Sequence, residues 1–314
     1  MMSPIVSRCG VSMPRHRFPW VVGSLLLGLS LLAGCKSTDT TFESKEAAME
    51  ALVQAAERGD SGAMAAMLGP GGEEIVSSGD QVRDTHALEL FVSIAREKTA
   101  FEDYEGESIA LIGNSEWPLP IPIVQEEGSW RFDAAAAKDE ILNRRIGRNE
   151  LTTIAVCHAY ADAQVEYARL ERDGNPRAYA QRLRSAPGKH DGLYWEAAAG
   201  EEESPMGDLV AMAADEGYAM ESKPAQYHGY IFKTLRAQGP NAPGGARSYV
   251  KDGLMTGGFA LLAWPIDYGN SGIMTFIVNQ QGIVFEKDLG PETAKLAPAI
   301  EAYDPDDSWY PTGD

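Results

Sequence analysis

The sequence predicts an α+β protein in which helices precede an antiparallel sheet twice along the chain. Segments with helical spacing, many of them rich in alanine, fill residues 45–98 and 134–172. Short runs rich in β-branched and aromatic residues follow them, at 101–133 and 229–289. Hydrophobic residues make up 44% of the 314 residues, which is enough to bury a core. Each group of helices is therefore expected to pack against the sheet that follows it.

The first 34 residues have the composition of a signal peptide. Basic residues and no acid precede the apolar run "VVGSLLLGLSLLAGC", which is shorter than the roughly 20 residues that span a bilayer as a helix. The letters "LAGC" resemble the lipobox of bacterial lipoproteins, and this resemblance implies that the Cys35 thiol receives a diacylglycerol. An ordinary signal peptide cleaved nearby is the alternative. We expect residues 1–34 to be removed and residues 35–43 to form a lipidated tether.

Composition limits the partners of an exported chain of this kind. The formal net charge is −19, so nucleic acid and anionic headgroups would repel the protein, and we expect no nucleic-acid partner. Attachment to the membrane would come from the lipid alone. Lys36 follows Cys35, so the aspartate associated with retention in the inner membrane is missing. This favours the outer membrane, with the protein facing the periplasm and with another envelope protein as its partner.

Residues 44–147 form the first predicted domain. Ser44, Asp60 and Asp80 each stand where an N-cap would begin a helix, and three strand-like runs follow the third helix. This order, which ends in "PIPIVQEEGSWRFD", resembles the cone-shaped fold of the nuclear-transport-factor-2-like superfamily and implies a curved antiparallel sheet. The alternating prolines of "WPLPIPIV" predict an edge strand, because their missing N–H groups would lie along one side.

Residues 148–290 form the second predicted domain, and residues 291–314 a C-terminal helix and an acidic tail. Four strand-like runs are "GYIFKTL", "GGFALLAW", "IMTFIVN" and "IVFEKDL", after a long helix with a possible joint at Gly147. These runs and "AYADAQVEYA" resemble the globular heads of type II secretion pseudopilins and type IV pilins. The resemblance implies a long helix packed on a four-stranded antiparallel meander through small residues such as Ala155 and Ala161. The apolar stem of pilins is absent, so polymerisation through one is not expected.

Over residues 42–309 the chain also closely resembles the bacterial domain of unknown function 2950 family. The segments that carry this resemblance include "ILNRRIGRNEL", "SAPGKHDGLYW", "YHGYIFK" and "TFIVNQQGIVFEKDLG". It implies an extracytoplasmic bacterial protein and no particular activity.

Two groups of residues are candidates for a site. Arg144, Arg145 and Arg148 lie close together in an otherwise acidic chain, and predict either salt bridges between domains or a site for an anion or a partner. The second group consists of aromatic and polar residues in two segments that could converge: His190, Asp191, Tyr194, Trp195, Tyr227, His228 and Tyr230. An ordinary interface has the same composition.

The sequence contains no recognised catalytic arrangement. No two histidines have the spacing of a zinc pair, no P-loop is present, and Cys157 lies among apolar residues of a predicted helix as a buried residue would. We expect no metal and no cofactor. The preferred hypothesis is a non-enzymatic binding or assembly module. The alternative is an envelope hydrolase or carbohydrate-binding protein that uses the aromatic and polar group.

Overall fold

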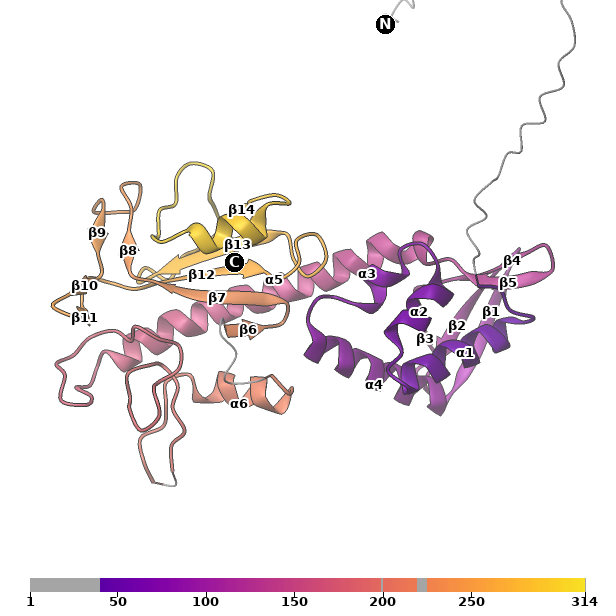
Figure 1. Cartoon of the computed structure of the whole chain (residues 1–314), viewed down its shortest axis with the longest axis horizontal. Coiled ribbons are helices and arrows are strands. Elements are labelled where there is room, and N and C mark those ends of the chain that lie inside the picture. The colour runs from indigo at the N-terminus through magenta and orange to yellow at the C-terminus, as the bar shows by residue number, and fades with distance from the viewer. Residues whose placement is uncertain (1–39, 199, 219–224, 314) are drawn as a thin grey trace, which may run out of the picture. The chain divides into compact units, whose positions relative to one another are not determined.

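The computed structural model describes residues 40–198, 200–218 and 225–313 (Figure 1). The predicted signal peptide, Cys35 and most of the tether lie outside this part of the chain. The structure is α+β, and it has two hydrophobic cores built from residues between Phe42 and Trp309. No helix in the described ranges combines the length and the apolarity that crossing a membrane requires.

The first core lies between four helices and a sheet. The helices are α1 (Lys45–Glu57), α2 (Ser61–Leu68), α3 (Gly72–Val76) and α4 (Gln81–Glu97). The predicted caps are confirmed, because Ser44, Asp60 and Asp80 accept hydrogen bonds from the third backbone N–H that follows each of them. Each of these three side chains therefore fixes the point where its helix begins.

The first sheet is antiparallel throughout. Its strands are β1 (Thr99–Tyr104), β2 (Glu107–Ile112), β3 (Trp117–Pro118), β4 (Ile123–Glu126) and β5 (Ser129–Phe132). The order is β1-β2-β4-β5, and β3 pairs with β2 beside β4. The prolines therefore do not form one edge strand. They divide the segment into β3 and β4, and Leu119 and Ile121, which lie between these two strands, are buried.

Helix α5 (Ala134–Tyr167) belongs to both halves of the described chain. It passes through Gly147 without a break, so the predicted joint there is absent. One glycine costs a helix only about 1 kcal/mol, which packing on both sides can offset. The predicted small-residue contact with the second sheet is wrong in part: Ala161 is buried but Ala155 is exposed. The buried face includes Cys157 and Tyr160, and the Tyr160 hydroxyl donates to the Ala260 carbonyl at 3.2 Å.

The second sheet holds the four predicted strands and two more. Its strands are β6 (Ala225–Tyr227), β7 (Tyr230–Leu235), β12 (Ala260–Pro265), β13 (Met274–Asn279), β14 (Val284–Asp288) and β15 (Tyr310–Pro311). The order is β15-β14-β13-β12-β7-β6, all antiparallel, so β7, β12, β13 and β14 form the expected meander. Helix α5 packs against β12, β13 and β14. In the predicted acidic tail, β15 adds to the edge of this sheet.

Short elements surround the second sheet. They are α6 (Gly207–Asp215), α7 (Thr293–Leu296), the 3₁₀ turn Ala297–Ala299, and two ribbons of paired strands, β8 (Ala237–Gln238) with β9 (Arg247–Ser248) and β10 (Val250–Lys251) with β11 (Leu254–Met255). Helix α6 begins after a turn at residues 204–207, in which the Gly207 N–H donates to the Ser204 carbonyl.

The two halves of the described chain are joined by a buried carboxylate. Asp80 caps α4 with one oxygen, and its other oxygen accepts from the Tyr218 hydroxyl at 2.7 Å and from the Gly229 N–H at 2.8 Å. Asp80 is only 5% exposed. The residue that begins α4 therefore also holds the turn between β6 and β7.

Candidate functional site

A cavity of about 530 Å³ opens between α4, α5 and the β6–β7 turn. Its floor is apolar and includes the buried side chains of Leu52, Leu68, Leu119 and Ile121. Three arginines, Arg83, Arg145 and Arg148, line it as well, and we call it the arginine cavity. Its size and its mixture of apolar walls with a few polar groups are typical of small-molecule sites.

Helix α4 shows why a hollow remains here. The helix has 17 residues, but Ala95 is the only one that is fully buried. Its apolar side chains Val82, Leu88 and Phe91 are half-buried, and all three line the arginine cavity. A surface helix normally packs its apolar stripe against the core. In α4 much of that stripe faces the cavity instead, so the wall remains available to an apolar group.

The three arginines of this cavity have no carboxylate partner among the residues that the structure describes. Arg83 Nη1 lies 3.2 Å from His228 Nδ1. Arg145 donates to the backbone carbonyls of Glu74 and Ile75 and to the Asn270 side chain, which are all neutral acceptors. Arg148 is exposed, and its guanidinium donates to none of the described groups. The three permanent cations thus form no ion pair with a described carboxylate, although Asp84 and Glu216 also line the cavity.

Electrostatics points in the same direction. Burial lowers the pKa of Arg145; the Arg83 and Arg148 charges lower it as well, while Asp84 and Asp267 oppose them. Burial and the Arg83 charge also lower the pKa of Arg148. Guanidinium groups nevertheless stay protonated in proteins. A bound anion would therefore offset the cost of burying these charges.

The predicted arginine group is divided by the helix on which it lies. Arg145 and Arg148 face the cavity, whereas Arg144 forms an exposed ion pair with Glu140 at 2.6 Å on another face of α5. Arg145 does connect the two halves, because it reaches both α3 and Asn270, but it does so through neutral oxygens and forms no salt bridge. Arg83 was missed. It lies about 60 residues earlier, and no local pattern relates α4 to α5.

His228 is held on both ring nitrogens at the mouth of the arginine cavity. Its Nε2 lies 2.5 Å from Glu216 Oε2, and its Nδ1 faces Arg83. A guanidinium only donates, so Nδ1 accepts and Nε2 carries the proton that is donated to Glu216. The residue has φ +48°, which is uncommon outside glycine, and this turn conformation aims the ring at Arg83. Neither nitrogen is free to act as a base toward a ligand.

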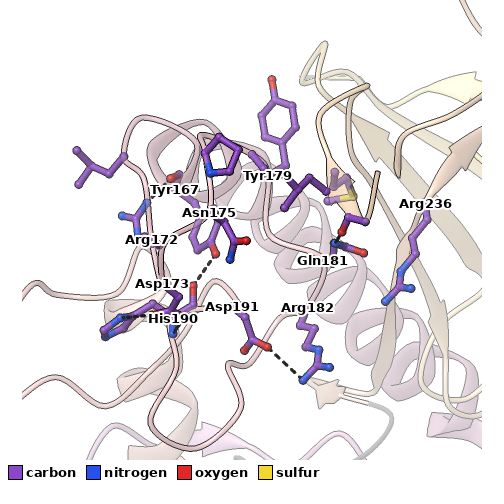
Figure 2. A pocket seen from close by; sticks show the side chains of 16 residues that line it. Tyr167, Arg172, Asp173, Asn175, Tyr179, Gln181, Arg182, His190, Asp191 and Arg236 are labelled. Atoms are coloured by element: carbon purple, nitrogen blue, oxygen red, sulfur yellow. Dashed lines mark hydrogen bonds and ion pairs between the residues drawn. The ribbon is translucent and has the colours of Figure 1, made fainter. Parts of the chain in front are cut away.

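A second pocket, of about 360 Å³, is lined by polar side chains of the 172–191 segment (Figure 2). The side chains of Arg182 and Asp191 point toward one another there, at 3.5 Å. His190 Nδ1 lies 3.4 Å from Asp173, and the Tyr167 hydroxyl donates to the His190 carbonyl at 2.5 Å. These contacts hold the loop in place and leave a shallow polar surface.

The predicted aromatic and polar group does not gather into one site. His190 and Asp191 line the pocket of Figure 2, Tyr194 and Tyr227 line a third cavity beneath α6, His228 lines the arginine cavity, and Trp195 and Tyr230 are buried in the core. Two ring contacts occur within the group, His190 with Trp195 at 4.7 Å and Tyr227 with His228 at 4.1 Å.

Catalytic chemistry finds little support in the part of the chain that the structure describes. Cys157 is fully buried, and burial raises the pKa of its thiol to about 12, so it is not a nucleophile at neutral pH. No group of His, Cys, Asp and Glu side chains in the described ranges could hold a metal ion. The arginine cavity offers binding groups, and both ring nitrogens of its His228 are engaged, by Glu216 and by Arg83.

Comparison with known proteins gives a family and no activity. The chain matches no curated protein and no solved structure. A family model does match residues 39–312, which include both cores, the junction at Asp80 and the cavities described above. The chain therefore belongs to the family described as Protein of unknown function (DUF2950).

Proposed function

We propose that this chain is a non-enzymatic binding module of the bacterial cell envelope, and that it holds a small anionic molecule with an apolar portion in the arginine cavity. One observation carries the proposal. Arg83, Arg145 and Arg148 lie without carboxylate partners above an apolar floor, in a chain whose net charge is −19.

Arginines without an ion pair are unexpected in a chain that is this acidic. With 46 acidic and 27 basic residues, an arginine of this protein has many carboxylates available as partners. Arg96, for example, binds both Glu50 and Glu57. Arginines that stay unpaired beside a cavity are therefore placed to receive an acceptor from outside the chain, and guanidinium groups bind carboxylates and phosphates well.

The cellular setting of the module is part of the same proposal. The lipobox-like residues before Cys35 support a lipid anchor, and Lys36 supports the outer membrane facing the periplasm. The resemblances to nuclear-transport-factor-2-like proteins and to pilin heads support a module for binding or assembly, with a second envelope protein as partner. Crosslinking in intact cells tests this setting: we expect a defined partner that is lost in Cys35→Ala, and recovery of no partner would contradict it.

The ligand site is tested by calorimetric titration with dodecyl phosphate, using the chain from Lys36 onward because it contains both cores. Arg83→Ala and Arg148→Ala should each weaken binding about tenfold or more, since a charge-assisted hydrogen bond contributes roughly 1.5–3 kcal/mol. Arg144→Ala is the matched control, because this neighbouring arginine is paired with Glu140 away from the cavity. Equal losses in all three variants, or no binding by the wild type, would refute the proposed site.

The second candidate function is a hydrolase or carbohydrate-binding protein. The pocket of Figure 2 favours it, because His190, Asp173 and Asp191 stand there beside Tyr167 and Tyr179. Soluble peptidoglycan fragments and other envelope glycans are suitable probes. Binding or cleavage that is lost in His190→Ala, but kept in Arg148→Ala, would favour this function over the first.

A further inference from the structure

A cavity of about 890 Å³ lies beneath α6 and is larger than the two hollows described above. Phe232 of β7 and Leu261 of β12 form one wall, and Tyr160 of α5 forms part of another. Residues 181–187 complete the enclosure together with α6. We call this the α6 cavity. It is separate from the arginine cavity, although Tyr218 lines both.

Helix α6 presents an apolar face to this cavity without burying it. Leu209, Val210 and Ala213 line the cavity, and none of the nine residues of the helix is fully buried. Met212 lies on another face and is 57% exposed. An amphipathic helix normally covers its apolar stripe with protein. Here the stripe borders a hollow whose opposite wall is also apolar, which is the arrangement that encloses an apolar ligand.

Among the residues that the structure describes, the charged side chains that line the α6 cavity are the arginines Arg182, Arg184 and Arg236. The Arg184 Nη1 atom is buried and has no hydrogen-bond partner in the described structure, whereas Nη2 forms an ion pair with the exposed Glu196 at 3.6 Å. Arg236 is exposed and forms no ion pair with any described residue. A buried guanidinium nitrogen without an acceptor is uncommon, and a ligand anion would supply the acceptor.

Two of the three arginines lie at a border with the pocket of Figure 2. Gln181, Arg182 and Arg236 line both hollows, so the two adjoin through polar side chains. Arg184 lines the α6 cavity alone, and Leu209, Val210 and Phe232 contribute apolar wall. A ligand that fits this lining carries a negative charge for the arginines and an apolar portion for the remaining wall.

We propose that the α6 cavity is a second binding site and that it takes a molecule with an acyl chain and an anionic head. The head is received by Arg184 and Arg236, and the chain lies between α6 and the sheet. The inference does not rest on the arginine cavity or on lipid anchoring. A free fatty acid and a membrane lipid both supply this chemistry.

Calorimetric titration with dodecanoate tests the site, with the chain from Lys36 onward. Arg184→Ala and Arg236→Ala should weaken binding about tenfold. Shortening the ligand to decanoate should weaken it by roughly fourfold per methylene removed. Met212→Ala is the control on the outer face of α6, and circular dichroism shows whether each variant keeps its fold. Arg236 is exposed, so its variant remains informative should Arg184→Ala not fold.

The two cavities are told apart by stoichiometry. In the Arg148→Ala background, one equivalent of dodecanoate should still bind, and adding Arg236→Ala should weaken that binding about tenfold. Three outcomes would overturn the proposal. They are loss of all dodecanoate binding in Arg148→Ala, an affinity that does not depend on the length of the acyl chain, and equal effects of Arg236→Ala and Met212→Ala. A dodecanoyl lysophospholipid distinguishes the sources: binding of dodecanoate alone indicates a free fatty acid, binding of the lysophospholipid indicates a lipid, and binding of neither overturns the site.

Discussion

Replacement of Asp80 by alanine should destabilise this protein far more than the loss of an ordinary helix cap. A cap contributes about 1 kcal/mol. Asp80 also accepts hydrogen bonds from the Tyr218 hydroxyl and the Gly229 N–H, and both donors are buried. Leaving each without a partner costs roughly 1–3 kcal/mol. The expected loss is therefore roughly 3–7 kcal/mol, a large share of the 5–15 kcal/mol by which domains are usually stable.

Urea unfolding followed by circular dichroism measures this loss. Asp60→Ala is the matched control, because Asp60 caps α2 through one bond to the Ala63 N–H, is exposed, and binds no donor from the second half of the chain. It should cost about 1 kcal/mol. Tyr218→Phe removes only one of the two buried donors and should fall between the two aspartate variants. The reasoning is refuted if Asp80→Ala costs no more than Asp60→Ala.

Two further predictions concern Glu286 and Gly147. Burial raises the pKa of Glu286 above its ordinary 4.5, and the nearby Glu150 charge raises it further. The Glu286 carboxyl therefore binds its proton more tightly in the folded state than in the unfolded state. As a result, the folded state loses stability as the pH rises through the raised pKa. Glu286→Gln should therefore increase the unfolding free energy at pH 7 but not well below pH 4.5, and a less stable variant at pH 7 would contradict this. Gly147→Ala should stabilise α5 by about 1 kcal/mol in thermal unfolding, because a Cβ added there meets nothing within 4 Å. Gly229→Ala is the contrasting variant and should destabilise the protein. Gly229 has φ +77°, and a Cβ added there would lie 2.9 Å from Asn149 Nδ2.

Local pattern was sufficient to predict the fold class, the caps and the central meander. Ser44, Asp60 and Asp80 act within three residues of their own positions, and the runs that became β7, β12, β13 and β14 carry their β preference in a few consecutive residues. The proline segment shows where local reasoning ends. The missing N–H groups of its prolines predicted an edge strand. Leu119 and Ile121 are buried instead, in a core that includes helices many residues earlier in the chain.

The candidate sites depend on contacts between segments that are distant in sequence. Arg145 and Arg148 were recognised because they are neighbours along one helix, but their partner in the cavity, Arg83, comes from α4. The α6 cavity combines described residues from 156 to 261, and only the folded arrangement brings Arg182, Arg184 and Arg236 together along it. The aromatic and polar group was predicted from residue type alone; five of its members line three separate hollows, and Trp195 and Tyr230 are buried.

Tyr218 gives the two cavities a common wall. Its ring contacts Tyr227 at 5.1 Å and stacks on His228 at 5.8 Å, and its hydroxyl is fixed by Asp80. A molecule that displaces this ring from one side changes the space available on the other. Thermodynamic linkage then requires reciprocity: whatever factor the first occupant imposes on the affinity for the second, the second imposes on the first. Any coupling between the two proposed sites would therefore pass through Tyr218, which lines both cavities.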